Sequence, residues 1–468
     1  MKRFLAVSLL LALSLMGLGC GSSSSANNSG SGAQSAQVFM TGEDAPLASV
    51  VGFDVTLNSV TLNGQSTTAT VISSPVTVDF ARLLGLRSPL AFNSVPAGTY
   101  ASATFVLANP VISYVDMTQN PPALNTMNGT LPNNQNPYTL TVPFASPLVV
   151  SANGLAGLKM EMDIRQSLAL DSNGQITGAV NPVIYIKATK ASDPDGLVTD
   201  LMGGLVSVNA AGNSFVLQGP YGRQLTVNVN SSTTFNSGWS INNLAAPAFV
   251  AVQGQFQADG SLIASGVEVV STAQSFVSGR VLQVANNSSG QAQSVTMWIG
   301  ETGADMVSWS DTIQTIDISA IQNSEYEICF LGSASPNALF DNTSIEVGQR
   351  IFLGGSYVNN TFTPSMISLR LQGVYGLFVP GSVDIINGNA GTFQLSNNGL
   401  VGYSVGGPVT VNTFNLTLFY NLSGLGQLQT TSTQIPLVAR GLLLKDPVSG
   451  TTQFYAGLVS EPPQTASH

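Results

Sequence analysis

The chain has almost no histidine, the side chain on which many active sites depend. Its single histidine is His468, the last of 468 residues, and terminal residues are seldom held in a fixed place. Catalytic triads with a histidine base, zinc sites built from histidine and iron facial triads are therefore excluded. We predict that the protein uses no cofactor, and no catalytic residue can be named from the sequence.

Charged side chains are also scarce, at 8% of the chain against roughly 25% in typical globular domains. Hydrophobic residues make up 44%, which excludes disorder driven by charge, and the shortage of Glu, Lys and Arg excludes coiled coils. The 14 Lys and Arg against 24 Asp and Glu give a formal net charge of −10. Because nucleic acid is bound through clustered basic residues, we predict no nucleic-acid partner.

The residues that are abundant predict an all-β protein. Ser, Thr, Asn and Gln supply most of the polarity, and 47 Gly and 23 Pro punctuate the chain, which is typical of short strands joined by turns. Phe53, Val55 and Leu57 alternate with polar residues, as in a half-buried strand. No stretch predicts a helix of more than two turns. Six dipeptides are typical of hairpin turns: Asn63-Gly64, Asn153-Gly154, Asn173-Gly174, Asp195-Gly196, Asp259-Gly260 and Asn387-Gly388.

The N-terminus has the pattern of an export signal. Lys2 and Arg3 precede an apolar run over 4–18, which is too short to span a bilayer and fits a signal peptide over 1–19. The sequence Gly17-Leu18-Gly19-Cys20 resembles the lipobox of bacterial lipoproteins, although that family usually has Leu where Gly17 stands. The resemblance implies cleavage after Gly19 and lipid attachment at Cys20. An ordinary secretory signal with an incidental cysteine is the alternative.

A tether rich in Gly, Ser and Asn follows the cysteine, so that 20–36 is predicted to be a lipid anchor with a flexible tether. By analogy with lipoprotein sorting, Gly21 in place of Asp favours the outer membrane or cell surface. Cleavage removes two basic residues, so 14 − 2 = 12 remain against 24 acidic residues, a balance of −12. Cys329 is then the only other cysteine and can form no intrachain disulfide. Its apolar neighbours favour a small buried residue over a reactive thiol.

Residues 37–190 carry three motifs that resemble an uncharacterised domain family of bacterial surface lipoproteins. The motifs are Thr41-Gly-Glu-Asp-Ala-Pro46, Val95-Pro-Ala-Gly-Thr-Tyr100 and Asn181-Pro-Val-Ile184. The second is also similar to an element of prealbumin-like and carbohydrate-binding-like sandwich modules. This resemblance implies an antiparallel β-sandwich in which Gly98 makes a tight turn and Tyr100 enters the next strand. It implies no activity.

The rest of the chain holds a degenerate repeat, predicted at 203–272, 276–371 and 373–460, before a disordered tail at 461–468. Each copy ends in a hairpin whose first strand contains a glycine: Phe249–Gly254, Ile351–Gly355 and Leu437–Gly441. The unit is similar to a small barrel of the oligonucleotide/oligosaccharide-binding type. The glycine predicts a bulge or sharp coil. The second copy is predicted to carry an insertion at about 300–345.

Few residues are candidates for binding. Trp239, Trp309 and Tyr221 could stack on sugars, whereas Trp298 lies in an apolar run and is predicted to be core. Asp171, Asn173, Asp193 and Asp195 are weak calcium candidates, with hairpin turns as the alternative role. Glu161 and Asp163 share one face of a strand and could form a carboxylate pair, but a solvated strand face or a turn is the favoured interpretation. The few charges otherwise gather at turns and domain joints.

The sequence thus predicts a lipid-anchored bacterial cell-envelope protein with a non-catalytic binding, adhesion or scaffold role. Its partners would be a membrane, through the N-terminal lipid, and a glycan or an envelope protein. Two alternatives remain open: a carbohydrate-active hydrolase that uses carboxylates alone, and an accessory subunit of an envelope assembly or export system.

Overall fold

The computed structural model describes residues 35–45, 49–83, 88–194, 196–219, 223–273, 275–330, 339–396, 408–446 and 449–462. Strands dominate, so the prediction of an all-β fold is confirmed. In the described residues the only α-helices are α1 (Ile164–Ser167) and α2 (Leu425–Thr430), and no helix there is long and apolar enough to cross a membrane. The predicted signal, Cys20 and most of the tether lie outside the described residues, whereas Ser35 and Ala36 already belong to a strand.

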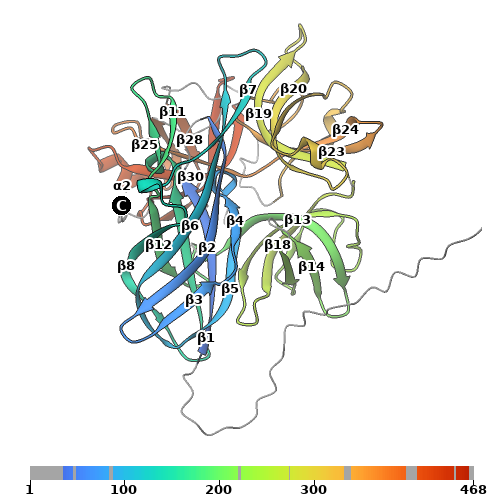
Figure 1. The fold of residues 1–468 in the computed structure, drawn as a ribbon. Helices are drawn as coiled ribbons and strands as arrows, with labels where there is room; N and C mark the ends of the chain where they lie inside the picture. The colour runs from blue at the N-terminus through green and yellow to red at the C-terminus, as the bar shows by residue number, and fades with distance from the viewer. Residues whose placement is uncertain are drawn as a thin grey trace, which may run out of the picture. The chain divides into compact units, whose positions relative to one another are not determined.

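The N-terminal part is a sandwich of two sheets around one core. The first sheet has the order β12-β9-β1-β5, with bounds β1 (Ser35–Ala45), β5 (Ser88–Pro96), β9 (Leu155–Asp163) and β12 (Ile184–Thr189). The second contains β2 (Val50–Gly64), β3 (Thr68–Ile72), β4 (Val76–Asp79), β6 (Gly98–Asp116), β7 (Ala123–Asn128) and β8 (Tyr138–Val150). A separate hairpin is formed by β10 (Leu168–Leu170) and β11 (Ile176–Val180). Figure 1 shows β2 and β6 running side by side.

Two local predictions for the sandwich are confirmed and one is wrong. Phe53, Val55 and Leu57 are buried while the polar residues between them are partly exposed. At the predicted tight turn, β6 begins at Gly98, and Tyr100 is fully buried with its hydroxyl donating to the Pro96 carbonyl oxygen at 2.8 Å. The sandwich is not purely antiparallel, because β1 and β9 pair in parallel. Hydrophobic alternation specifies which face of a strand is buried, but it does not specify strand direction.

The first repeat is a closed barrel of five main strands. Its sheet has the order β15-β14-β13-β17-β18, and a parallel pairing of β15 with β18 closes it. The bounds are β13 (Val198–Asn209), β14 (Ser214–Gln218), β15 (Gln224–Asn228), β17 (Phe249–Phe256) and β18 (Leu262–Ser271). A short strand, β16 (Thr234–Phe235), lies parallel to β18. Figure 1 shows β13, β14 and β18 of this barrel in green.

The second and third repeats use a similar strand plan, and the third is closed by an equivalent parallel pairing. The second contains β19 (Ser275–Asn286), β20 (Ala292–Thr302), β21 (Thr312–Asp317), β22 (Tyr326–Ile328), β23 (Arg350–Val358) and β24 (Thr361–Leu369). The third contains β25 (Gln372–Phe378), β26 (Asp384–Asn387), β27 (Ala390–Ser396), β28 (Val409–Thr413), β29 (Leu418–Tyr420), β30 (Pro436–Lys445) and β31 (Thr452–Ser460). The segment 300–345, predicted as an insertion, supplies β21 and β22, so part of it is barrel framework.

The glycine in the fourth main strand of each repeat sits where the predicted bulge occurs. Pairing shifts register at Gly254, between Gly354 and Gly355, and at Gly441. A Cβ atom at Gly254, Gly355 or Gly441 would collide with a carbonyl oxygen of the neighbouring strand. Each repeat therefore has a bulge at the equivalent position of its fourth main strand. Only glycine can occupy that position without a shift of the backbone.

The described residues from Ser35 onwards form one compact unit, although each group of sheets has its own core. Phe39 of the sandwich joins the core of the first repeat, and its ring stacks on Phe256 with centroids 4.9 Å apart. The sandwich and the repeats are thus packed against one another.

Candidate functional site

A pocket of about 600 Å³ lies where the sandwich, the first repeat and the second repeat meet, and we call it the junction pocket. Its charged lining residues come from four separate elements: Arg82 of the 3-10 helix η1 (Phe80–Leu83), Asp200 of β13, Glu301 of β20 and Arg350 of β23. Its apolar lining residues include Leu201, Met202, Phe249, Phe276 and Val307. The pocket therefore combines an apolar wall with charges of both signs.

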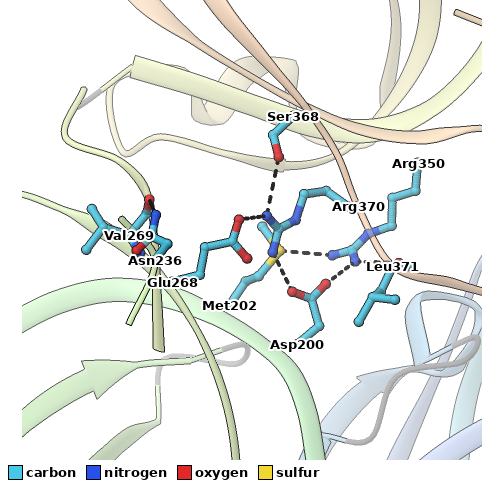
Figure 2. A network of polar contacts seen from close by, with 9 residues as sticks. All are labelled: Asp200, Met202, Asn236, Glu268, Val269, Arg350, Ser368, Arg370 and Leu371. Atoms are coloured by element: carbon cyan, nitrogen blue, oxygen red, sulfur yellow. Dashed lines mark hydrogen bonds and ion pairs between the residues drawn. The ribbon is translucent and has the colours of Figure 1, made fainter. Parts of the chain in front are cut away.

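A buried ion network lies beside this pocket and joins the first two repeats, as Figure 2 shows. Asp200 Oδ2 is 2.7 Å from Arg350 Nη1, and Asp200 Oδ1 is 2.5 Å from Arg370 Nη2. Arg370 Nη1 also contacts Glu268 Oε1 at 2.6 Å. The Arg370 and Asp200 side chains are both fully buried. Two carboxylates of the first repeat are thus neutralised by two guanidinium groups of the second.

The backbone around Asp200 explains how its carboxylate reaches both arginines. Asp200 has a φ of 48°, in the left-handed region that aspartate tolerates better than most residues. The pairing of β13 with β17 shifts register between Val198 and Leu201, and such irregularities redirect a side chain. Burial lowers the pKa of Arg370, but the charges of Asp200 and Glu268 outweigh burial and raise it above its ordinary value.

A second ionic contact joins the sandwich to the second repeat through Arg82, which lines the junction pocket. Arg82 Nε lies 2.8 Å from Asp79 Oδ2, and Arg82 Nη2 lies 2.6 Å from Asp311 Oδ1. The guanidinium also stands over the Trp298 ring, 5.6 Å from its centroid. Asp79 is buried and accepts the Phe53 N–H at 2.8 Å. Burial raises the pKa of Asp79, while the charge of Arg82 opposes that rise.

Asp54, beside this contact, should make the stability of the protein depend on pH. Burial, followed by the charge of Asp79, raises the pKa of Asp54 to about 6. Above that pH the ionised carboxylate costs the folded state free energy, and the cost fades as the pH falls from about 6 towards the ordinary value of 3.8. Asp54→Asn should therefore stabilise the protein at neutral pH by about 1 kcal/mol, after discounting the shift for solvent screening.

Urea unfolding at neutral pH and near the ordinary carboxyl pKa measures this difference. The control is Asp116→Asn, because hydrogen bonds from Thr118 lower the pKa of that exposed carboxyl, so its removal should bring no gain. An Asp54→Asn protein that gains as much stability in acid as at neutral pH would contradict the assignment.

Of the aromatic residues predicted as ligand platforms, the two that the structure describes pack against different cores. Trp239 is partly buried against the core of the first repeat, and Trp309 is partly buried against the core of the second. Trp309 lies edge-on to Tyr357 and Phe362. Tyr221 lies outside the described residues. Trp298, predicted as core, is 5% exposed, which confirms that prediction.

The calcium candidates that the structure describes act in turns. The Oδ1 atom of Asp171 accepts the N–H groups of Asn173 and Gln175, both at 2.8 Å, and so closes the β10–β11 hairpin. Asp193 Oδ2 accepts the Lys190 N–H at 3.0 Å. Asp195 lies outside the described residues. Within the described part of the chain, no group of three or more His, Cys, Asp or Glu could hold a metal ion.

Glu161 and Asp163 are both buried, so the prediction of a solvated strand face is wrong. Their strand, β9, is paired on both sides by β1 and β12, and its last seven residues are all buried. Glu161 Oε2 lies 3.6 Å from Lys159 Nζ, and Asp163 Oδ1 accepts the Gln166 N–H at the start of α1. Neither carboxylate lines the junction pocket.

Cys329 is 2% exposed, which confirms that it is a small buried residue. Burial is the main reason that the pKa of its thiol rises to about 12. The thiol is therefore protonated and unreactive at neutral pH.

Two segments match known families of uncharacterised domains. Residues 35–177, in the sandwich, match a family described as domain of unknown function (DUF4382), and residues 203–268, in the first repeat, match domain of unknown function (DUF5666). No curated protein matches the chain. Among solved structures, drosophila Unr CSD456 is similar over 57% of this chain and 98% of its own, at 7% identity and a TM-score of 0.15.

Proposed function

We propose that this protein is a lipid-anchored component of the bacterial cell envelope that binds a ligand without chemical turnover, with the junction pocket as its binding site. The observation that carries the proposal is the pocket itself. Its volume of about 600 Å³ falls within the roughly 300–1,000 Å³ of ligand sites, which combine apolar walls with a few polar groups. A small ligand, a sugar unit of a glycan or a side chain of an envelope protein would fit such a space.

The charges of the junction pocket support binding over hydrolysis. Asp200 and Glu301 are the two carboxylates among its lining residues. Asp200 is held by two guanidinium groups at 2.7 Å and 2.5 Å, so both of its carboxylate oxygens are already engaged in ion pairs. A glycosidase needs two working carboxylates, and Glu301 alone does not meet that requirement.

Val307→Trp should abolish ligand binding with little effect on stability. Val307 lines the junction pocket and is 65% exposed, so an indole there takes up pocket volume without disturbing a core. Val358, 62% exposed on β23 and outside the pocket lining, provides the matched control Val358→Trp. A thermal-shift screen with small metabolites and cell-wall sugars should find a ligand that raises the Tm of wild type and of the control only.

Equal protection of Val307→Trp by that ligand would place binding elsewhere. Conversion of the ligand to a product during incubation would contradict binding without turnover and favour the hydrolase.

The anchor is tested separately through Cys20. Expressed in a bacterium with a lipoprotein pathway, the wild type should incorporate labelled palmitate and partition into the detergent phase. Cys20→Ala should lose both properties, because the acyl chains are the proposed hold on the membrane. Cys329→Ala, the matched cysteine control, should keep both. A wild type that is unlabelled and stays in the aqueous phase would overturn the lipid anchor and favour an ordinary secretory signal.

A further inference from the structure

A second, smaller cavity adjoins the junction pocket, and we call it the side pocket. It has a volume of about 40 Å³ and shares four lining residues with the junction pocket: Arg82, Gly300, Glu301 and Arg350. Arg280, Trp298 and Ser278 add further polar groups to its wall. This volume exceeds the roughly 10–15 Å³ that one water molecule needs, so a carboxylate-sized group can enter.

Three buried polar atoms in the wall of the side pocket have no hydrogen-bond partner among the described residues. Two are donors, Nη1 of Arg280 and Nε1 of Trp298, and one is an acceptor, Oε2 of Glu301. Buried polar atoms are rarely left unsatisfied in folded proteins, because each has lost its water. Because Arg280, Trp298 and Glu301 all line the side pocket, a bound group that both accepts and donates hydrogen bonds would supply the partners that these atoms lack.

One guanidinium group that lines the side pocket, that of Arg280, forms no ion pair with a carboxylate of the described residues. In the described part of the chain, Arg350 and Arg82 have carboxylate partners, whereas no ion pair involves Arg280. Burial, with the charge of Arg350 as a second cause, lowers the pKa of Arg280 to about 9. The guanidinium is still charged at neutral pH, so an entering carboxylate would find a buried cation and two N–H donors.

The junction pocket adds an apolar wall beside this polar corner. The rings of Phe249 and Phe276 lie there with centroids 4.2 Å apart, and Leu201 and Met202 line the same space. A molecule whose charged end enters the side pocket can thus place an apolar body against these residues.

We propose that the two pockets together bind a free α-amino acid with an apolar side chain, an inference that rests on the proposed function. The α-carboxylate accepts hydrogen bonds from Arg280 and Trp298. The α-ammonium group donates to Glu301, and the side chain packs against Phe249 and Phe276. All three unsatisfied atoms then have partners, and the ligand brings no net charge.

Titration calorimetry of the full mature chain with L-phenylalanine tests the inference. 3-Phenylpropionate lacks the amino group and phenethylamine lacks the carboxylate, and we expect each to bind at least about tenfold more weakly than phenylalanine. Arg280→Met should weaken phenylalanine binding by a similar factor. Arg165→Met is the matched control, because Arg165 stands over Tyr375 and lines neither pocket, and it should bind as wild type does.

Two results would overturn the inference: no binding of phenylalanine by the wild type, or unchanged affinity in Arg280→Met. Glu301→Gln provides an independent variant if Arg280→Met does not fold, and it should lower affinity for phenylalanine but not for 3-phenylpropionate. The proposed function survives such a failure if another ligand protects wild type and Val358→Trp but not Val307→Trp. Both proposals fail if no ligand distinguishes those two variants.

Discussion

Arg370→Met should lower the free energy of unfolding by about 3–5 kcal/mol, the usual cost of removing one partner from a buried ion pair. Arg370 contacts Asp200 and Glu268 at 2.5 Å and 2.6 Å, and its side chain is fully buried. Methionine fills a similar volume but leaves Glu268 buried without its cation. Urea unfolding followed by fluorescence measures the loss.

Two further variants separate the ionic effect from the loss of packing. Glu268→Leu added to Arg370→Met removes both charges of one pair and should restore much of the lost stability, since apolar replacement of a buried pair is often neutral or better. Lys445→Met removes a partly exposed pair, in which Lys445 Nζ lies 3.5 Å from Glu346 Oε1, and should cost less than about 1 kcal/mol. If Arg370→Met costs no more than Lys445→Met, the network does not hold the two repeats together.

Gly441→Ala should lower the free energy of unfolding by about 3 kcal/mol, at the upper end of the cost of overpacking. The added Cβ would collide with the carbonyl oxygen of Tyr455 on β31, and a backbone atom cannot move aside as a flexible side chain can. The matched control is Gly426→Ala in α2, where a Cβ meets nothing within 4 Å and where alanine should stabilise the helix by about 0.5–1 kcal/mol.

The same urea titration measures both glycine variants. A Gly441→Ala protein as stable as Gly426→Ala would show that the bulge in β30 is not required for closing the barrel. Gly254→Ala and Gly355→Ala should each destabilise their own repeat, since a backbone carbonyl blocks the Cβ there as well.

The features predicted well from the sequence are those that a few neighbouring residues decide. Alternation around Phe53 identified a half-buried strand, the turn before Tyr100 was located, and the glycines of the fourth strands identified the bulges. Each of these depends on local backbone geometry or on which face of one strand is apolar. The parallel pairing of β1 with β9 was missed because it joins segments more than a hundred residues apart, and neither segment encodes the direction of its partner.

The junction pocket could not be predicted for a similar reason. Its charged lining residues, Arg82, Asp200, Glu301 and Arg350, come from three distant parts of the chain and form no motif. One signal was present in the sequence, because Arg350 begins β23 directly before the apolar residues Ile351–Leu353, and Arg370 directly follows the buried end of β24. A charged residue in such surroundings needs a buried partner. The expectation that charges gather at joints was right for Asp200, but it missed how deeply the carboxylate is buried.

The ion network limits how the repeats can be recombined. Both of its carboxylates belong to the first barrel and both of its guanidinium groups belong to the second. A fragment cut between 272 and 276 would expose two unmatched acids on one piece and two unmatched bases on the other. Although the three barrels have similar strand plans, we expect the first two to fold only as a pair, so that shuffling or duplicating one of them alone would require new complementary charges on its neighbour.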